Sequence, residues 1–285
     1  MRWSPGDRSN IEDRRGGGMK MGGAAPVGIG GVLLLLALSW ATGTNFLTLL
    51  DTGGGGEPVS ESRPVSPAET TPEEERLADM VGAVATDTQE VWRGLLGTRY
   101  QQAKTVLFRG VTPTACGTGD SATGPFYCPA DQLVYLDMGF FGDLSQRFGA
   151  PGDFAQAYVI AHEYGHHVQN LLGINEQVGN DRAGANSRAV ALELQADCFA
   201  GVWGHSATQR GRASQGKVEL DPGDVDEALQ AAASIGDDRL QKMAGARVQP
   251  ERFTHGTSAQ RVEWFRRGME SGDPRRCDTF AAVTQ

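Results

Sequence analysis

Two histidines and a glutamate in one short segment have the spacing of a metal site. The segment is His162-Glu163-Tyr164-Gly165-His166, inside a stretch whose apolar residues recur with helical spacing. Residues four apart share one helix face, so both imidazoles can bind one ion, and zinc prefers nitrogen ligands. A catalytic zinc leaves one position for water, from which Glu163 can take a proton. The pattern fixes only three positions, so a buried helix with hydrogen-bonded histidines is the alternative interpretation.

Two carboxylates further along the chain repeat this spacing. Glu193 lies 27 residues after His166, and Asp197 lies four residues later in a second helical pattern. If this helix folds back on the first, Glu193 becomes the third ligand and Asp197 accepts a hydrogen bond from a ligand histidine. Apolar neighbours flank both carboxylates, which argues against a solvated acidic face because unpaired charges are costly there. The alternative in which Asp197 is the direct ligand stays open, because both carboxylates share one helix face.

Neighbouring residues offer no third histidine of the metzincin type. That pattern needs glycine at position 169 and histidine at position 172, where this chain has Gln169 and Leu172. His167 points about 100° around the helix from His166, because each residue of an α-helix advances by that angle. We therefore expect His167 to pack or hydrogen-bond away from the metal.

The elements that carry these residues are two predicted helices joined by a polar loop. The first spans residues 153–172, with Asp153 as its N-cap and Gly173 after its end, and the second spans residues 187–205. Further helices are expected at residues 73–96, 224–235 and 258–269, and strands at residues 105–108 and 132–137. This order predicts an α+β domain, mostly helical, with a small sheet.

The composition fits a folded domain and excludes one class of partner. The chain has 285 residues, of which 39% are hydrophobic and 21% charged, and its net charge is -9. Binding of nucleic-acid phosphates needs a basic patch, and the chain has no run of lysine and arginine. We therefore expect no nucleic-acid partner, and the sequence indicates no oligomeric state.

An apolar stretch near the start of the chain predicts a membrane anchor. Residues 27–50 carry no charge, and a helix of that length rises about 36 Å, enough to cross a bilayer core. Net basic residues precede the stretch and acidic ones follow it, which predicts a single-pass protein with a cytoplasmic N-terminus and an extracytoplasmic body. The expected layout is a tail at 1–26, a transmembrane helix at 27–50, a Gly/Pro-rich linker at 51–72 and the domain at 73–285. A cleaved signal peptide is the alternative.

Four cysteines agree with a body outside the cytoplasm. An even number of cysteines in an oxidising compartment suggests two disulfides, although four cysteines allow three connectivities. Cys116 and Cys128 bracket a short turn-rich stretch, so we favour that pair on loop length, which leaves Cys198 and Cys277. A zinc site built from cysteines is the competing idea, but the chain has no C-x-x-C spacing.

The combined motifs resemble a known family. Glu-x-x-x-Asp after His-Glu-x-x-His is the gluzincin pattern, and the chain is similar to the bacterial membrane-anchored putative neutral zinc metallopeptidases. The matching stretches are residues 126–129, 134–137, 147–155, 161–170, 193–198 and 255–261. They cover most of residues 73–285, and the resemblance includes the N-terminal anchor. The chain does not depart from the family at the metal positions.

This resemblance implies a zincin-like fold and a zinc-dependent endopeptidase acting on extracytoplasmic proteins or peptides. It implies Zn²⁺ held by His162, His166 and Glu193, Asp197 behind the ligands, and Glu163 as the catalytic base. Gluzincins often add a distant histidine or tyrosine that stabilises the oxyanion, and His255 is the candidate, although a loop histidine near a helix start is equally compatible. Zincins usually carry an edge strand before the zinc helix, here residues 133–137, to which an extended peptide substrate adds.

Two functions of another kind compete with catalysis. One is a binding module that keeps zinc only for structure, and the other is a chaperone of the cell envelope that holds peptides without cutting them. A structural zinc site is usually closed by four protein ligands and needs no base, so an intact Glu163 favours catalysis. Substrate and cleavage preference are not indicated by the sequence.

Overall fold

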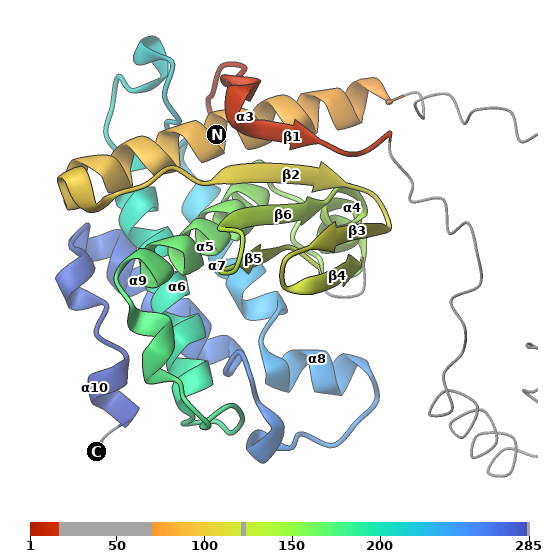
Figure 1. Cartoon of the computed structure of the whole chain (residues 1–285), viewed down its shortest axis with the longest axis vertical. Helices are drawn as coiled ribbons and strands as arrows, with labels where there is room; N and C mark the ends of the chain where they lie inside the picture. Colours follow the sequence, from red (N-terminus) through yellow and green to blue (C-terminus); the bar gives the residue numbers. More distant parts are fainter. Residues whose placement is uncertain (17–69, 121–123, 284–285) are drawn as a thin grey trace, which may run out of the picture.

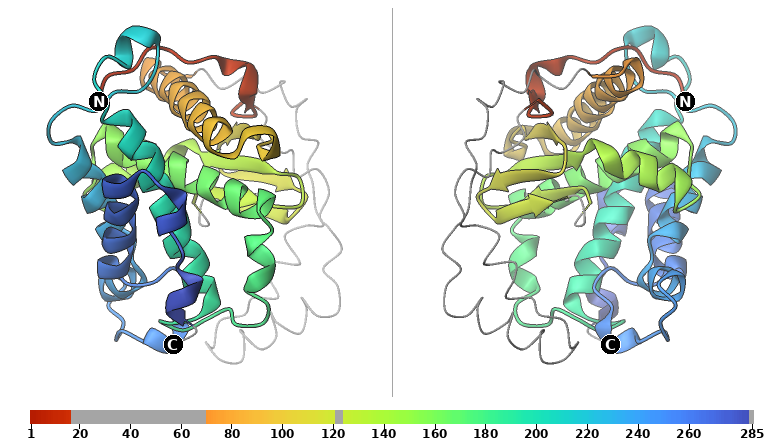
Figure 2. Two further views of the ribbon diagram at one scale, coloured as in Figure 1. Left: turned by 90° about the vertical axis from the view of Figure 1, so that its left-hand side faces the viewer. Right: turned by 90° about the vertical axis from the view of Figure 1, so that its right-hand side faces the viewer.

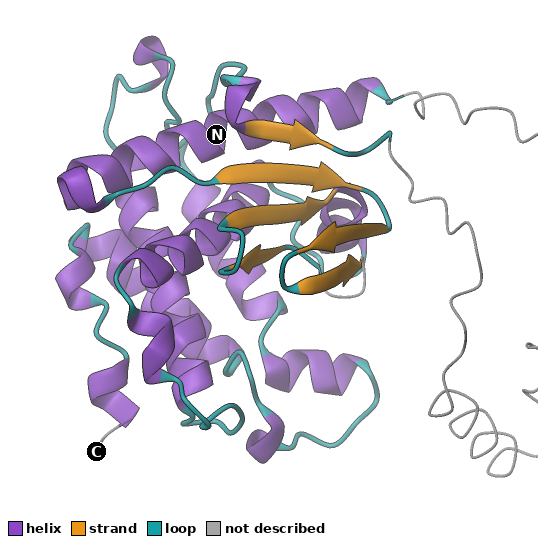
Figure 3. Ribbon diagram, viewed as in Figure 1, coloured by secondary structure: helices purple, strands orange, loops and turns teal. Residues whose placement is uncertain are grey.

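The computed structural model describes residues 1–16, 70–120 and 124–283, which form an α+β body as expected (Figures 1 and 3). The strands are β1 Ile11–Asp13, β2 Lys104–Phe108, β3 Val111–Thr114, β4 Gly117–Asp120, β5 Phe126–Cys128 and β6 Leu133–Asp137. The helices are α3 Pro72–Leu96, α4 Met138–Gln146, α5 Asp153–Leu171, α6 Arg188–Ala207, α7 Asp224–Ser234, α8 Asp237–Met243, α9 Ser258–Ser271 and α10 Phe280–Val283.

The main sheet has the strand order β1-β2-β6-β5. β1 and β6 are each parallel to β2, whereas β5 is antiparallel to β6, and β3 and β4 form a separate hairpin. The expected strand at 133–137 is therefore present, but it is not an edge strand, because β6 lies between β2 and β5. The edge strand on this side is β5, which is too short for its apolar pattern to be recognised in the sequence.

The helix α5, which carries the histidines, is packed on several sides at once. It contacts α3, α6 and α7 as well as β5 and β6. Phe154, Tyr158 and Tyr164 are fully buried along it, and the chain leaves the helix at Gly173, whose φ of 69° favours glycine. A helix that is apolar on nearly all sides belongs in the centre of a domain. The rigid placement of α5 fixes where its polar side chains point.

Glycines let neighbouring helices approach α6 closely. A Cβ on Gly165, within the His-Glu-x-x-His segment, would lie 3.0 Å from the Ala196 carbonyl oxygen. A Cβ on Gly268 of α9 would lie 2.0 Å from the Cys198 carbonyl oxygen, so no larger residue fits there. Ser187 caps the start of α6 by accepting a hydrogen bond from the Val190 amide. These contacts bring α5, α6 and α9 together around the carboxylates of α6.

Both disulfides expected from the cysteine count are present. Cys116 pairs with Cys128, which confirms the pairing favoured on loop length, and Cys198 pairs with Cys277. The second disulfide ties the end of the chain to α6 across a sequence separation of 79 residues. Closing a long loop removes much conformational entropy from the unfolded chain, on the order of 4 kcal/mol in the loop-entropy model.

The N-terminal segment lies against the body beside α3 (Figure 2). β1 pairs with β2 along Ile11–Asp13, and the side chain of Arg15 is buried between the carboxylates of Asp13 and Glu75. The Met1 ammonium lies within 3.2 Å of carboxylate oxygens of Asp153 and Asp224, which start α5 and α7. Residues 1–15 are thus part of the folded unit rather than a separate tail.

This docking bears on the orientation expected from the charges. Strands that share hydrogen bonds must lie in one compartment, so the pairing of β1 with β2 puts residues 11–13 on the same side of a membrane as the body. A cytoplasmic tail at 1–26 with a body across the membrane therefore does not agree with this structure. Residues 27–50 and most of the linker at 51–72 lie outside the described residues. Among the described helices, none has the length and apolar composition to cross a membrane.

Candidate metal centre

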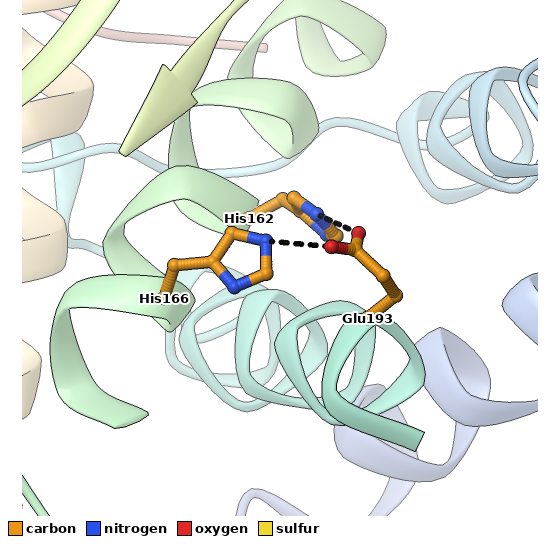
Figure 4. A group of neighbouring side chains, drawn as sticks. All are labelled: His162, His166 and Glu193. Atoms are coloured by element: carbon orange, nitrogen blue, oxygen red, sulfur yellow. Dashed lines mark ion pairs between the residues drawn. The ribbon is translucent and has the colours of Figure 1, made fainter. Parts of the chain in front are cut away.

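The structure brings His162, His166 and Glu193 together (Figure 4). The two imidazoles come from successive turns of α5, and the carboxylate reaches between them from α6. The Nε2 atom of His162 lies 3.3 Å from one carboxylate oxygen of Glu193, and the Nε2 atom of His166 lies 3.5 Å from the other. The third partner expected from the sequence thus lies near both histidines, whereas Asp197 contacts only His162, at its Nδ1 atom.

These three side chains fit a zinc ion. Ligands at about 2.0–2.1 Å from a tetrahedral metal are separated from one another by roughly 3.3 Å. The observed separations of 3.3 and 3.5 Å between nitrogen and oxygen atoms match that value. Two neutral imidazoles and one carboxylate are also a donor set of catalytic zinc sites, in which the fourth position is left for water.

Asp197 lies behind His162 in a fully buried hydrogen-bond network. Its Oδ1 atom accepts a hydrogen bond from the His162 Nδ1 atom at 2.8 Å and another from the Tyr158 hydroxyl at 2.5 Å. Arg261 of α9 donates two further bonds, from Nε at 2.9 Å and from Nη2 at 2.8 Å. A carboxylate in this position fixes the tautomer with hydrogen on Nδ1, which leaves the Nε2 lone pair directed at the metal.

The charges around the site set its protonation. Burial by itself would lower the pKa of His162, but the carboxylates of Asp197 and Glu193 outweigh it and raise that pKa to about 10. Burial would raise the pKa of Asp197, but Arg261 and His162 lower it to about 2. The nearby carboxylates therefore favour a second proton on His162, at Nε2, and a metal ion bound at that nitrogen must displace it.

Glu163 is placed for proton transfer. It is 6% exposed, and this burial raises the pKa of its carboxyl, against the effect of the neighbouring histidines. A raised carboxyl pKa brings a general base closer to the pH at which it works. Glu163 lines the same cleft as both histidines and Glu193, so its carboxylate is available to a substrate bound there.

A cleft of about 1110 Å³ opens over these residues. Its lining residues come from α5 and α6, the β5 region, the aromatic residues around α4 and the loop before α9. Its lining includes Phe126, Phe140, Phe148, Val159, Leu192 and Leu240. A cleft with apolar walls and a few convergent polar groups is the usual form of a substrate site.

His255, in the loop before α9, also lines this cleft. Its backbone N–H donates to an oxygen of Asp237 at 2.7 Å, and its Nδ1 atom lies 3.4 Å from the other oxygen. The carboxylate of Glu193, followed by that of Asp237, raises the pKa of His255 against the effect of burial. The imidazole is half exposed, so a bound substrate can reach it.

Several partners of the site were not expected from the sequence. No role was expected for Arg261 and Tyr158, although both surround Asp197, and Gln169 was considered only as the absent glycine of another motif. The helix α9 carries several charged residues, so its local sequence did not mark Arg261 as the one that is buried. His167 behaves as predicted, because its ring atoms bond to the Tyr127 hydroxyl and the Gln101 carbonyl oxygen, away from the metal ligands.

Comparison with known proteins agrees with this site. The family model described as putative neutral zinc metallopeptidase matches residues 1–280. The uncharacterized protein YpfJ of Escherichia coli strain K12 is 47% identical over 296 residues, which cover 98% of this chain and 99% of that protein. The uncharacterized protein Rv2575 of Mycobacterium tuberculosis strain H37Rv is 46% identical over 207 residues, or 71% of this chain and 70% of that protein. No solved structure matches the chain. Given a family model that spans nearly the whole chain and a relative this similar, the chain belongs to the putative neutral zinc metallopeptidase family.

Proposed function

We propose that the protein is a zinc-dependent endopeptidase that hydrolyses peptide bonds of extracytoplasmic proteins or peptides. The observation that carries this proposal is the convergence of His162, His166 and Glu193 at tetrahedral separations, beside a buried glutamate and inside a substrate-sized cleft. A bound zinc supplies polarisation of the scissile carbonyl and a lowered pKa for the attacking water. The remaining steps belong to side chains of this protein.

In the proposed reaction Glu163 moves the proton. Its carboxylate accepts a proton from the attacking water and then delivers it to the amine that leaves, so that one residue serves as base and as acid. Asp197 and Arg261 keep His162 in the orientation that the metal requires, because both charges are buried and bonded to one another. The apolar lining of the cleft excludes bulk water and strengthens these electrostatic effects.

His255 is the proposed donor to the developing oxyanion. Its raised pKa favours the protonated, hydrogen-bonding form, and it lines the same cleft as Glu163 and Glu193. A donor aimed at the charge that forms during reaction lowers the barrier, by about 2.7–4 kcal/mol in well-studied oxyanion sites. Asp237 fixes the loop before α9, because its carboxylate accepts hydrogen bonds from the backbone N–H groups of Thr254, His255 and Gly256.

Strand β5 is the proposed docking site for the backbone of the substrate. As the edge of the main sheet it can pair with an extended peptide, and Phe126 and Tyr127 of β5 also line the cleft. Main-chain pairing of this kind tolerates many sequences. This supports an endopeptidase that acts on extended segments.

The alternative function is a non-catalytic zinc-containing module of the cell envelope that binds peptides or acts as a chaperone. The same cleft and edge strand serve that function, so geometry alone does not separate the two. The burial of Glu163 beside the ligands favours the peptidase, because a module that only binds peptides gains nothing from a buried carboxylate with a raised pKa.

Metal removal tests the proposed function. We expect the purified protein to contain about one zinc per chain, as a site with three ligands and one open position binds one ion. It should cleave an unfolded protein substrate, lose this activity in a chelator and regain it when zinc is returned. Peptides identified by mass spectrometry report the cleavage sites. A zinc-loaded protein that binds the substrate without cutting it would establish the alternative.

We also propose that the folded body lies outside the cytoplasm. Two disulfides in one domain support an oxidising compartment, and the pairing of β1 with β2 puts the N-terminal segment in the same compartment as the body. A membrane anchor at residues 27–50 stays a prediction. Alkylation of protein from intact cells, without reduction, should label none of the four cysteines. Labelling of all four would place the body in a reducing compartment.

A further inference from the structure

We infer that Gln169 and Gln195 form a hydrogen-bond relay that orients the metal ligand His166 and is anchored at the backbone carbonyl of Cys277. The inference rests on the proposed metal site and assigns a positioning role to two residues that the family pattern leaves without one. It concerns how the chain prepares a ligand, and its test does not require turnover.

The relay is continuous from the ligand to the end of the chain. The His166 Nδ1 atom lies 2.8 Å from the Gln169 Oε1 atom. The Gln169 amide donates to the Leu192 carbonyl oxygen at 2.7 Å and to the Gln195 Oε1 atom at 3.1 Å. The Gln195 amide in turn donates to the Cys277 carbonyl oxygen at 2.9 Å.

The direction of each hydrogen bond in this relay follows from the groups at its two ends. A backbone carbonyl can only accept, so the NH₂ group of Gln195 must face Cys277 and its Oε1 atom must face Gln169. Gln169 therefore turns its NH₂ group to Gln195, and the Leu192 carbonyl requires the same orientation. The Oε1 atom of Gln169 then faces His166, whose Nδ1 atom must donate. The Nε2 lone pair of His166 is left directed toward Glu193 and the metal.

The far end of the relay is fixed covalently. Gln169 and Cys277 are fully buried, and Gln195 is 6% exposed, so no water competes freely for these groups. Cys277 is tied by its disulfide to Cys198, on the same helix as Gln195. Thr279 adds a second tie by donating to the Ala191 carbonyl oxygen at 2.6 Å. The Cys277 carbonyl, which sets the direction of these hydrogen bonds, is therefore held close to α6.

The two ligand histidines are held by different chemistry. His162 is bonded to a carboxylate that is neutralised by Arg261, whereas His166 is bonded to a neutral amide. A further carboxylate behind His166 would add uncompensated negative charge to a buried site that already holds Glu163 and Glu193. An amide orients the ring without that cost, and this explains why a relay of two glutamines occupies the position.

A double-mutant cycle on zinc affinity tests the inference. Gln169→Met and Gln195→Met keep the length of the side chain and remove its hydrogen bonds. We expect Gln169→Met to weaken zinc binding by about 10–100-fold, the range for partners of metal ligands. Gln195→Met should weaken it as well, although Gln195 touches no ligand, and should add nothing in the Gln169→Met background. Competition with a chelator gives the affinities, and the absorption spectrum of the Co²⁺-substituted protein reports ligand geometry.

Gln89→Met is the matched control. Gln89 is an equally buried glutamine that bonds to the Ala103 amide and to the hydroxyls of Tyr100 and Tyr164, and it bonds to none of the three proposed ligands. Its substitution should leave zinc affinity and the cobalt spectrum unchanged. Should Gln169→Met fail to fold, Gln195→Met carries the test, because it leaves every ligand and Gln169 in place.

The outcomes separate the relay from the proposed function. Wild-type affinity and spectrum in both glutamine variants would overturn the relay and leave the metal site intact. Losses that simply add, or that Gln89→Met shares, would also overturn it, since they indicate general loosening of the core. A wild-type protein that binds no zinc would remove the proposed metal site, and the relay with it.

Discussion

Replacing Glu163 with glutamine should abolish peptide hydrolysis while zinc stays bound. The side chain keeps its size and loses only the ability to accept a proton, and Glu163 is not among the three residues whose donor atoms converge. Loss of general-base catalysis is expected to reduce the turnover rate by about 10²–10⁴-fold. The measurement is the rate of cleavage of a quenched peptide, together with zinc content by atomic absorption.

The matched control is Glu251→Gln, which makes the same change at an exposed position. It should retain wild-type activity and zinc content. Near-full activity of Glu163→Gln on a peptide that the wild type cleaves would show that another group moves the proton. Loss of zinc from the same variant would mean that Glu163 contributes to the metal site itself.

The second prediction separates the two carboxylates of α6. Glu193→Ala removes the carboxylate that lies between both histidines, and two imidazoles alone should not retain zinc through dialysis. Asp197→Ala leaves all three donor side chains in place and should weaken zinc binding by about 10–100-fold. Zinc stoichiometry after dialysis and competition with a chelator measure both effects. The assignment would be reversed if Asp197→Ala lost all metal while Glu193→Ala kept it.

Asp197→Ala should also destabilise the fold far more than Glu193→Ala. It leaves Arg261, which is 3% exposed, as an unpaired buried cation, and breaking such a pair costs about 3–5 kcal/mol. Urea unfolding in a chelator measures this free energy without a contribution from zinc. Exchanging Arg261 for methionine in the same chain should recover part of the loss. Glu263→Ala, which breaks an exposed pair with Arg267 on α9, should change the stability by about 1 kcal/mol at most.

The long helices were predictable because their apolar period is a local property. Residues 73–96, 153–172 and 187–205 were expected as helices and appear as α3, α5 and α6 with ends shifted by one or two residues. Short elements were not recognised, among them β1, β5 and α8. Three residues of a strand contain too little periodicity, and β1 exists only through its pairing with a strand more than 90 residues away.

The sequence alone determined which side chains can share one helix face. Spacing of four residues puts His162 and His166 on one helix face, and Glu193 and Asp197 on another, because helix geometry is the same in every fold. It could not say which carboxylate meets the metal, since one face holds both. Only the tertiary structure shows which carboxylate reaches both histidines. The helix α9 packs against α6, Arg261 binds Asp197, and Glu193 lies beside the two Nε2 atoms. The glutamine relay to Cys277 and the docking of β1 depend in the same way on contacts between distant segments, which leave no local pattern in the chain.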